Sequence, residues 1–183
     1  ELIYSSSRVF STSVNRSSGD FASSSVLGNG DFYKFSVSQN GIYKLSYSYL
    51  KSINVIKGEV SSSLINIYGN HNGMLPERNG EKRIDDLAKN SIWIEDGGDG
   101  VFGEDDYLLF YGQSPDKWIS NVTLSVFRFQ KHLYSEVSNY FLILNDNSGP
   151  KRISTNPYAV QSENKVVTSF DDFKAREDEV TNL

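Results

Sequence analysis

The sequence predicts a mostly β domain, either an antiparallel β-sandwich or a jelly-roll-like fold, with at most one or two short helices. Aromatic residues make up 13% of the chain, and such side chains favour pleated, half-buried surfaces. Fourteen Gly indicate many turns. Several short apolar runs are separated by polar, Gly-rich segments, and they do not alternate with helical patterns as they would in a parallel sheet.

The clearest local signal is a pair of alternating runs, 32–37 and 42–47, on either side of Gln39-Asn40-Gly41. Asn-Gly between two such runs is the strongest short-range signal of a β-hairpin, because both residues tolerate a positive φ. We therefore expect these two runs to pair with each other.

The chain after this pair is expected to continue as a strand-rich domain. A short helix at 46–53 would carry Tyr49, Leu50 and Ile53 on one face. Further strands are expected at 64–69, 91–95, 107–112, 122–129, 139–145 and 165–170, with one edge strand near 4–10.

We divide the chain into three parts. Residues 1–30 are expected to form an extended lead-in, because ten Ser lie between positions 5 and 25 with little apolar periodicity. Residues 31–170 would form the β-sandwich, and the charged stretch 171–183 would be a linker.

Charge and cysteine content exclude several functions. The net charge of −5 without a basic stripe argues against nucleic acid as a partner, because binding to phosphate requires clustered Lys and Arg. No apolar run is long enough for a transmembrane helix. The chain has no Cys, which removes disulfides, thiolate metal sites and thiol nucleophiles.

No catalytic residue is assigned from the sequence. His71 and His132 are the only imidazoles, and a catalytic His requires a nucleophile and an orienting partner nearby. No Ser lies in a G-x-S-x-G motif. The pairs Asp85-Asp86 and Asp105-Asp106 are adjacent residues, which point to opposite faces of a strand and rarely converge on one bond. The chain by itself is therefore not expected to be an enzyme.

The acidic segment 95–106 is the best metal candidate, with six carboxylates in twelve residues. Hard oxygen ligands of this kind suit calcium, but glycines occupy two ligand positions of the EF-hand pattern. The alternative is a solvated turn, which we favour, so no cofactor is predicted. The candidate calcium ligands are Asp96, Asp99, Glu104, Asp105 and Asp106.

Two tryptophans leave a second alternative open. Trp93 and Trp118 could stack on sugar rings, although aromatic side chains on strands more often pack in a core. A surface carbohydrate-binding or adhesive β-sandwich module is therefore the alternative function.

A series of short motifs resembles a known family. In chain order, these motifs are Tyr33-Lys34, residues 40–45, Ile67-Tyr68-Gly69, residues 75–79, 83–87, 99–102, 105–112, Trp118 and 139–144. Together they resemble the N-terminal region of the gingipain-like cysteine peptidases that act as sortases of the type IX secretion system in Bacteroidota. The resemblance covers about residues 30–183. The Ser-rich start lies outside it, and Ala88-Lys89 departs from the acidic residue expected there.

The resemblance implies a role within a larger protein. Related prodomains are β-sandwiches that inhibit and chaperone their peptidase. The whole protein would remove C-terminal sorting signals from exported cargo and attach the cargo to the cell surface. It would act at the outer-membrane surface of a Gram-negative bacterium, beside a PorV-like outer-membrane β-barrel. The family's catalytic residues would lie beyond Leu183, in a downstream peptidase domain that follows the linker 171–183.

The resemblance therefore implies a non-catalytic N-terminal domain that acts by contact. Loops on a rigid scaffold commonly carry recognition, and the long loop 70–83 is the candidate contact with the peptidase domain or with secretion partners. Its candidate contact residues are His71, Met74, Leu75, Glu77 and Arg78.

Overall fold

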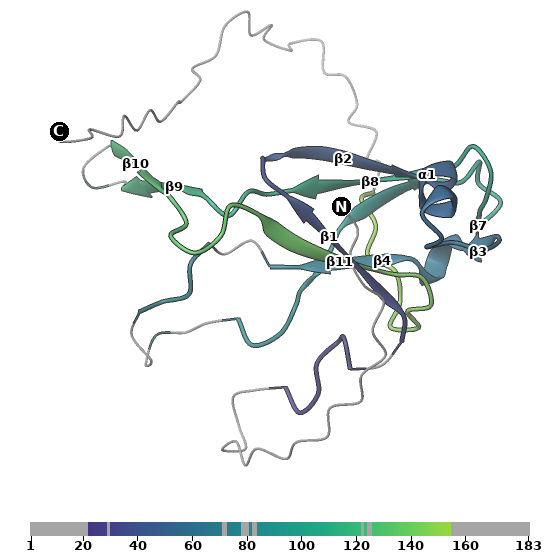
Figure 1. Ribbon diagram of the computed structural model, residues 1–183, viewed down its shortest axis with the longest axis horizontal. Coiled ribbons are helices and arrows are strands. Elements are labelled where there is room, and N and C mark those ends of the chain that lie inside the picture. Colours follow the sequence, from purple (N-terminus) through teal and green to yellow (C-terminus); the bar gives the residue numbers. More distant parts are fainter. Residues whose placement is uncertain are drawn as a thin grey trace, which may run out of the picture.

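The computed structural model confirms the predicted fold class (Figure 1). It describes residues 22–28, 30–70, 73–77, 81, 84–121, 123 and 126–154. Strands account for 40% of the described residues and helices for 7%, and the paired strands are antiparallel, as in a β-sandwich. Within these described residues, no helix is long and apolar enough to cross a membrane.

Two larger sheets form the body of the domain. The four-stranded sheet has the order β1 (Phe32–Val37), β11 (Ser138–Ile143), β4 (Asn66–Gly69) and β5 (Lys89–Asn90). The three-stranded sheet has the order β2 (Gly41–Ser46), β8 (Tyr107–Gly112) and β6 (Ile92–Glu95).

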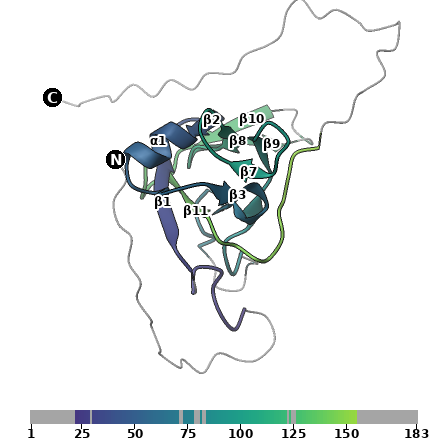
Figure 2. The same cartoon turned by 90° about the vertical axis from the view of Figure 1, so that its right-hand side faces the viewer.

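Two small sheets extend this body. One pairs β3 (Val60–Ser61) with β7 (Val101–Phe102), and the other pairs β9 (Lys117–Asn121) with β10 (Val126–Gln130). The helix α1 (Tyr47–Ser52) lies beside β2 at the end of the sandwich that carries β3 and β7 (Figures 1 and 2). The β9–β10 ribbon extends from the opposite end (Figure 1).

The predicted hairpin is wrong, although both of its strands exist. β1 pairs with β11 and β2 pairs with β8, so the two strands belong to different sheets. A two-residue hairpin of the Asn-Gly type requires positive φ at its central residues, and neither Asn40 nor Gly41 has one. Asn40 instead accepts a hydrogen bond from the backbone N–H of Ser114 (2.7 Å), which ties the bend to the end of β8. The segment is therefore a connection between sheets.

The predicted helix is present and begins and ends one residue inside the expected bounds 46–53. Ser46 caps the N-terminus, since its hydroxyl accepts a hydrogen bond from the backbone N–H of Tyr49 (3.3 Å). Tyr47 and Leu50 are buried, whereas the Tyr49 side chain is 46% exposed. Tyr47 packs edge-on against Phe102, which seats the helix on the β3–β7 pair.

The other predicted strands agree with the structure to differing degrees. The strand 107–112 is confirmed with its predicted bounds, and those at 64–69, 91–95 and 139–145 are confirmed with shifted ends. The strand predicted at 122–129 begins only at Val126, and β9 before it was missed. The strands predicted at 4–10 and 165–170 lie outside the described residues.

Aromatic side chains from both sheets make the core. Phe35 of β1 stacks on Tyr140 of β11, and Phe110 of β8 contacts both of these rings at centroid distances of 5.3 Å. The Tyr140 ring is fully buried, and its hydroxyl accepts a hydrogen bond from the backbone N–H of Gln113 (2.8 Å). This satisfied polar group links the two sheets, and burial raises the pKa of Tyr140.

Two glycines make room for these rings. A Cβ at Gly69 would lie 2.5 Å from the Tyr140 ring, which sits opposite it in the β4–β11 register. A Cβ at Gly112 would lie 2.7 Å from the Tyr43 ring. Both distances are below van der Waals contact, so the close approach of ring and backbone requires glycine at each position.

Candidate interaction surface

His132 has a structural contact at its imidazole. Its Nδ1 accepts hydrogen bonds from the backbone N–H groups of Tyr134 (3.2 Å) and Ser135 (2.9 Å), and its own backbone N–H donates to Asp116 (2.8 Å). The imidazole thus shapes the turn after β10 and holds this turn against the start of β9. His71 lies outside the described residues.

The acidic segment forms a series of tight turns between β6 and β8. Asp96 accepts a hydrogen bond from the backbone N–H of Gly98 (3.0 Å), Asp99 from that of Val101 (2.8 Å), and Asp106 from that of Gly103 (2.6 Å). Asp105 adopts a left-handed backbone with φ of 73°. These carboxylates therefore act as turn acceptors.

The pKa of the Asp96 carboxyl lies below its ordinary value. The Ser62 hydroxyl makes no hydrogen bond of good geometry with the described residues, but it lies close enough to the Asp96 carboxylate to lower the pKa of that group. The backbone N–H of Gly98 adds to the effect, while burial opposes it. Across the described ranges, no three acidic or His side chains gather into a group that could hold a metal ion.

The β9–β10 ribbon carries apolar side chains on both of its faces. Trp118 faces Phe129 across the strands with ring centroids 5.2 Å apart, and Phe127 lies on the same face. Ile119 and Val126 lie on the other face, and both are exposed. A two-stranded ribbon is marginally stable by itself in water, so exposed apolar groups on both faces are typical of an element that packs against a partner.

The predicted contact loop lies beside this ribbon. Gly73 sits against the side chain of Lys117 at the start of β9, since an added Cβ would lie 2.7 Å from that side chain. The sulfur of Met74 accepts a contact from the backbone N–H of Leu133 (3.4 Å). Of the predicted contact residues, Met74, Leu75 and Glu77 are described, whereas His71 and Arg78 are not.

The loop 73–77, the ribbon and the turn after β10 carry several exposed apolar side chains, and we call this set of residues the ribbon surface. An open groove runs between residues 74–77 and Leu133-Tyr134, with Gln130 at the end of β10 in its wall. The exposed fractions are 68% for Leu75, 41% for Trp118, 54% for Phe127, 74% for Leu133 and 86% for Tyr134. Sequence reasoning missed Phe127, Leu133 and Tyr134 as contact candidates, because their apolar character alone does not separate exposed from buried positions.

The two tryptophans do not share one sheet. Trp93 belongs to β6 in the three-stranded sheet, whereas Trp118 belongs to the ribbon. A sugar-stacking platform that requires both rings on one sheet face is therefore not formed.

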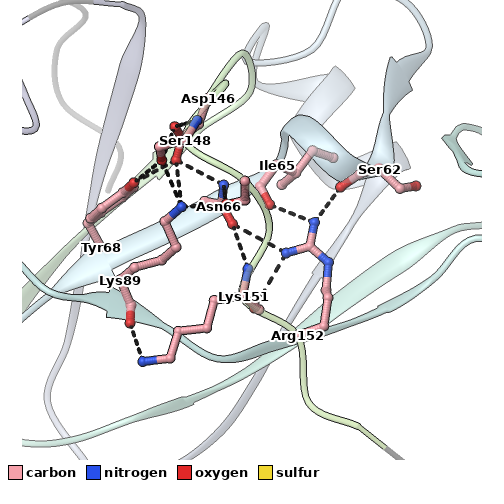
Figure 3. A network of polar contacts seen from close by, with 10 residues as sticks. Ser62, Ile65, Asn66, Tyr68, Lys89, Asp146, Ser148, Lys151 and Arg152 are labelled. Atoms are coloured by element: carbon pink, nitrogen blue, oxygen red, sulfur yellow. Dashed lines mark hydrogen bonds and ion pairs between the residues drawn. The ribbon is translucent and has the colours of Figure 1, made fainter.

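A polar network fixes the segment that follows β11 (Figure 3). At its centre is Asn66 of β4, which is fully buried. Its amide N–H groups donate to Asp146 Oδ2 (2.9 Å) and to the carbonyl of Gly149 (3.2 Å). Its Oδ1 accepts from the backbone N–H of Lys151 (3.4 Å) and from Arg152 Nη1 (3.3 Å). One side chain therefore holds four points of the segment 146–152.

Asp146 is the charged acceptor of this network. The Tyr68 hydroxyl donates to it (2.6 Å), and Lys89 forms an ion pair with it at 3.4 Å. Burial opposes ionisation of Asp146, but the hydrogen bonds from Ser148, Tyr68 and Asn66 outweigh this effect and hold the pKa of the carboxyl well below its usual range.

Arg152 anchors the end of the same segment. Its guanidinium donates to the carbonyls of Ser62 and Ile65, the latter at 2.9 Å. The neighbouring backbone joins β6, where the N–H of Ile92 donates to the carbonyl of Lys151 (3.2 Å) and the N–H of Ile153 donates to the carbonyl of Ile92 (2.9 Å). The segment 146–153 is thus fixed to both sheets, which defines where the chain leaves the sandwich.

Comparisons with known proteins support the fold. No family model matches the sequence, and no curated protein matches it. Among solved structures, the chain is similar to dimeric latent PorU from Porphyromonas gingivalis, with a TM-score of 0.53 and 23% sequence identity over 75% of this chain. The match covers 11% of the PorU chain, so the similarity concerns one small part of that protein.

Proposed function

We propose that this chain is a non-catalytic domain of a larger PorU-like protein, a gingipain-type cysteine peptidase that acts as a sortase in type IX secretion at the outer-membrane surface. Its β-sandwich is similar to part of PorU, and it has no Cys to serve as the nucleophile of such a peptidase. The domain would contribute contacts, and the peptidase chemistry would reside in the rest of the protein.

The ribbon surface carries this proposal. Leu75 and Tyr134 line one groove, whose wall also contains Gln130 at the end of β10, and both are more than half exposed. Phe127 is 54% exposed on β10 itself. Interfaces between domains bury about 600–1,500 Å², and aromatic side chains commonly anchor them. We propose that this surface packs on the peptidase portion. The solved PorU structure is of a latent form, and such packing is one physical means of keeping a peptidase latent.

Binding between the two parts tests the proposal. The purified domain and the separately expressed remainder of the parent protein are mixed, and their dissociation constant is measured together with the peptidase rate. Phe127→Ser should weaken binding about fivefold or more, since truncation of an aromatic anchor commonly costs over 1 kcal/mol. Tyr111→Ser is the matched control, because Tyr111 is 51% exposed on β8, outside the ribbon surface.

Equal affinity of the two variants would contradict the assignment of the ribbon surface. Absence of association, with no change in peptidase rate or folding yield, would contradict docking on the peptidase portion. The PorV-like barrel would then be the partner to test. Binding of glycans that is lost in Trp118→Ala would instead support the carbohydrate-binding alternative.

A further inference from the structure

One side of the sandwich is open between β1 and β2. A mostly apolar cavity of about 190 Å³ lies there, between the two sheets. Its inner wall includes Phe35, Leu50 and Phe110, which belong to the core, and Tyr33, Tyr43 and Tyr49 also line it. An apolar cavity of about 150 Å³ is large enough to bind benzene, so this one can accept a phenyl ring.

Each strand that flanks this cavity has one edge that pairs with no other strand of the described residues. In the described part of the chain, β1 has β11 as its single neighbour and β2 has β8 as its single neighbour. An unpaired edge presents backbone N–H and C=O groups that can pair with a further strand. The lining includes Tyr33, Ser36 and Val37 of β1 together with Tyr43 and Leu45 of β2, so the cavity lies along both of these strands.

The opposite side of the sandwich is covered. There the segment 146–153 bridges β4 and β6 through Arg152 and through the backbone of Ile92. The chain thus closes one side of the sandwich and continues from Ser154 into the tail 155–183. Among the described residues, no strand covers the side between β1 and β2.

The tail contains a segment with the properties that this opening requires. The sequence predicts a strand at residues 165–170, and this segment ends at Phe170. Asp171 and Asp172 follow, whereas Lys34 and Lys44 lie exposed on the outer faces of β1 and β2. The segment therefore combines an apolar ring with two negative charges, and the two strands that flank the opening carry positive charges.

The intervening residues are long enough to reach the opening. Residues 155–164 can span about 33 Å when extended. A four-stranded sheet is about 14 Å wide between its outer strands, and stacked sheets lie about 10 Å apart. The chain can therefore pass from the β6 side to the β1 edge without rearrangement of the sandwich.

We propose that residues 165–173 add to the free edge of β1 as a further strand and insert the Phe170 ring into the cavity between β1 and β2. Main-chain hydrogen bonds would hold the strand, and the cavity would select the ring, as in other cases of strand addition. The inference does not depend on the proposed function, since every participant belongs to this chain.

Hydrogen exchange on the full chain tests the inference. Amides of 165–173 should exchange at least about tenfold more slowly than in an unfolded peptide, which corresponds to about 1.4 kcal/mol. Phe170→Asp should abolish this protection and accelerate exchange in 32–37. Val180→Asp, a similar change further along the tail, should leave both regions unchanged.

Three results would overturn the inference. One is exchange of 165–173 at the unfolded rate in the wild-type chain. Another is protection of 165–173 that Phe170→Asp removes without any change in 32–37, because the segment would then pack elsewhere. The third is protection that rises with protein concentration, because a second copy would then supply the strand. Phe170 lies outside the described core, so Phe170→Asp leaves the core side chains unchanged.

Discussion

The substitution Asn66→Ala tests whether the polar network stabilises the fold. It removes four hydrogen bonds from a fully buried side chain, those with Asp146, Gly149, Lys151 and Arg152. Each bond contributes about 0.5–1.5 kcal/mol net. Three of these partners keep other bonds: Asp146 keeps Tyr68, Gly149 keeps Lys89 and Arg152 keeps the Ile65 carbonyl. We therefore expect the free energy of unfolding to fall by about 2–4 kcal/mol.

Urea unfolding measured by tryptophan fluorescence gives this free energy, since Trp93 and Trp118 report on different sheets. Asn139→Ala is the matched control, because Asn139 of the adjacent β11 accepts one solvent-exposed hydrogen bond from Ser36 (2.7 Å). Its cost should stay below about 1 kcal/mol. If the two variants differ by less than about 0.5 kcal/mol, the network contributes nothing beyond an ordinary surface contact, and the reasoning fails.

Two further predictions concern charge and metal. Because hydrogen bonds lower the pKa of Asp146, its ionised form stabilises the fold above the ordinary carboxyl pKa near 4, and this stability is lost as the pH falls through and below that value. Asp146→Asn should therefore show a shallower loss of unfolding free energy than the wild type between about pH 5 and 2, and an equal slope would contradict this. Millimolar calcium should leave the melting temperature nearly unchanged, because backbone N–H groups already use Asp96 and Asp99 as turn acceptors. A saturable rise that Asp96→Ala and Asp99→Ala abolish would show that the acidic segment binds calcium.

Local patterns predicted most strands but not their partners. The alternation in 32–37 and 107–112 depends on burial of one face, which any sheet provides, so both strands were found. Pairing depends on the turn, and the bend at Asn40 lacks the positive φ that a hairpin would use. The bend at Asn40 instead accepts a hydrogen bond from Ser114, which is distant in sequence. No short window of sequence contains both residues, so local patterns could not predict this contact.

The interaction surface and the network were predictable to different degrees. The loop around Leu75 was found because long loops carry recognition, and the structure brings it beside the ribbon. The exposure of Phe127 could not be predicted from its local sequence, because exposure depends on which other parts of the chain pack against the strand. Asn66 and Arg152 gave no signal, because their roles depend on partners about 80 or more positions away in the chain.

The network and the ribbon surface occupy different parts of the molecule, so the effects of substitutions in the two regions can be measured separately. The segment 146–153 is tied to β4 and β6, and the ribbon extends from the end of the sandwich opposite α1 (Figure 1). Loss of Asn66 would lower stability and leave the side chains of the ribbon surface in place, whereas loss of Phe127 would remove an exposed ring and leave the network intact. If the domain docks through the ribbon, Phe127→Ser should weaken binding without lowering the free energy of unfolding. Asn66→Ala should lower the free energy of unfolding without weakening binding by the folded domain. Any other combination would place the contact elsewhere on the sandwich.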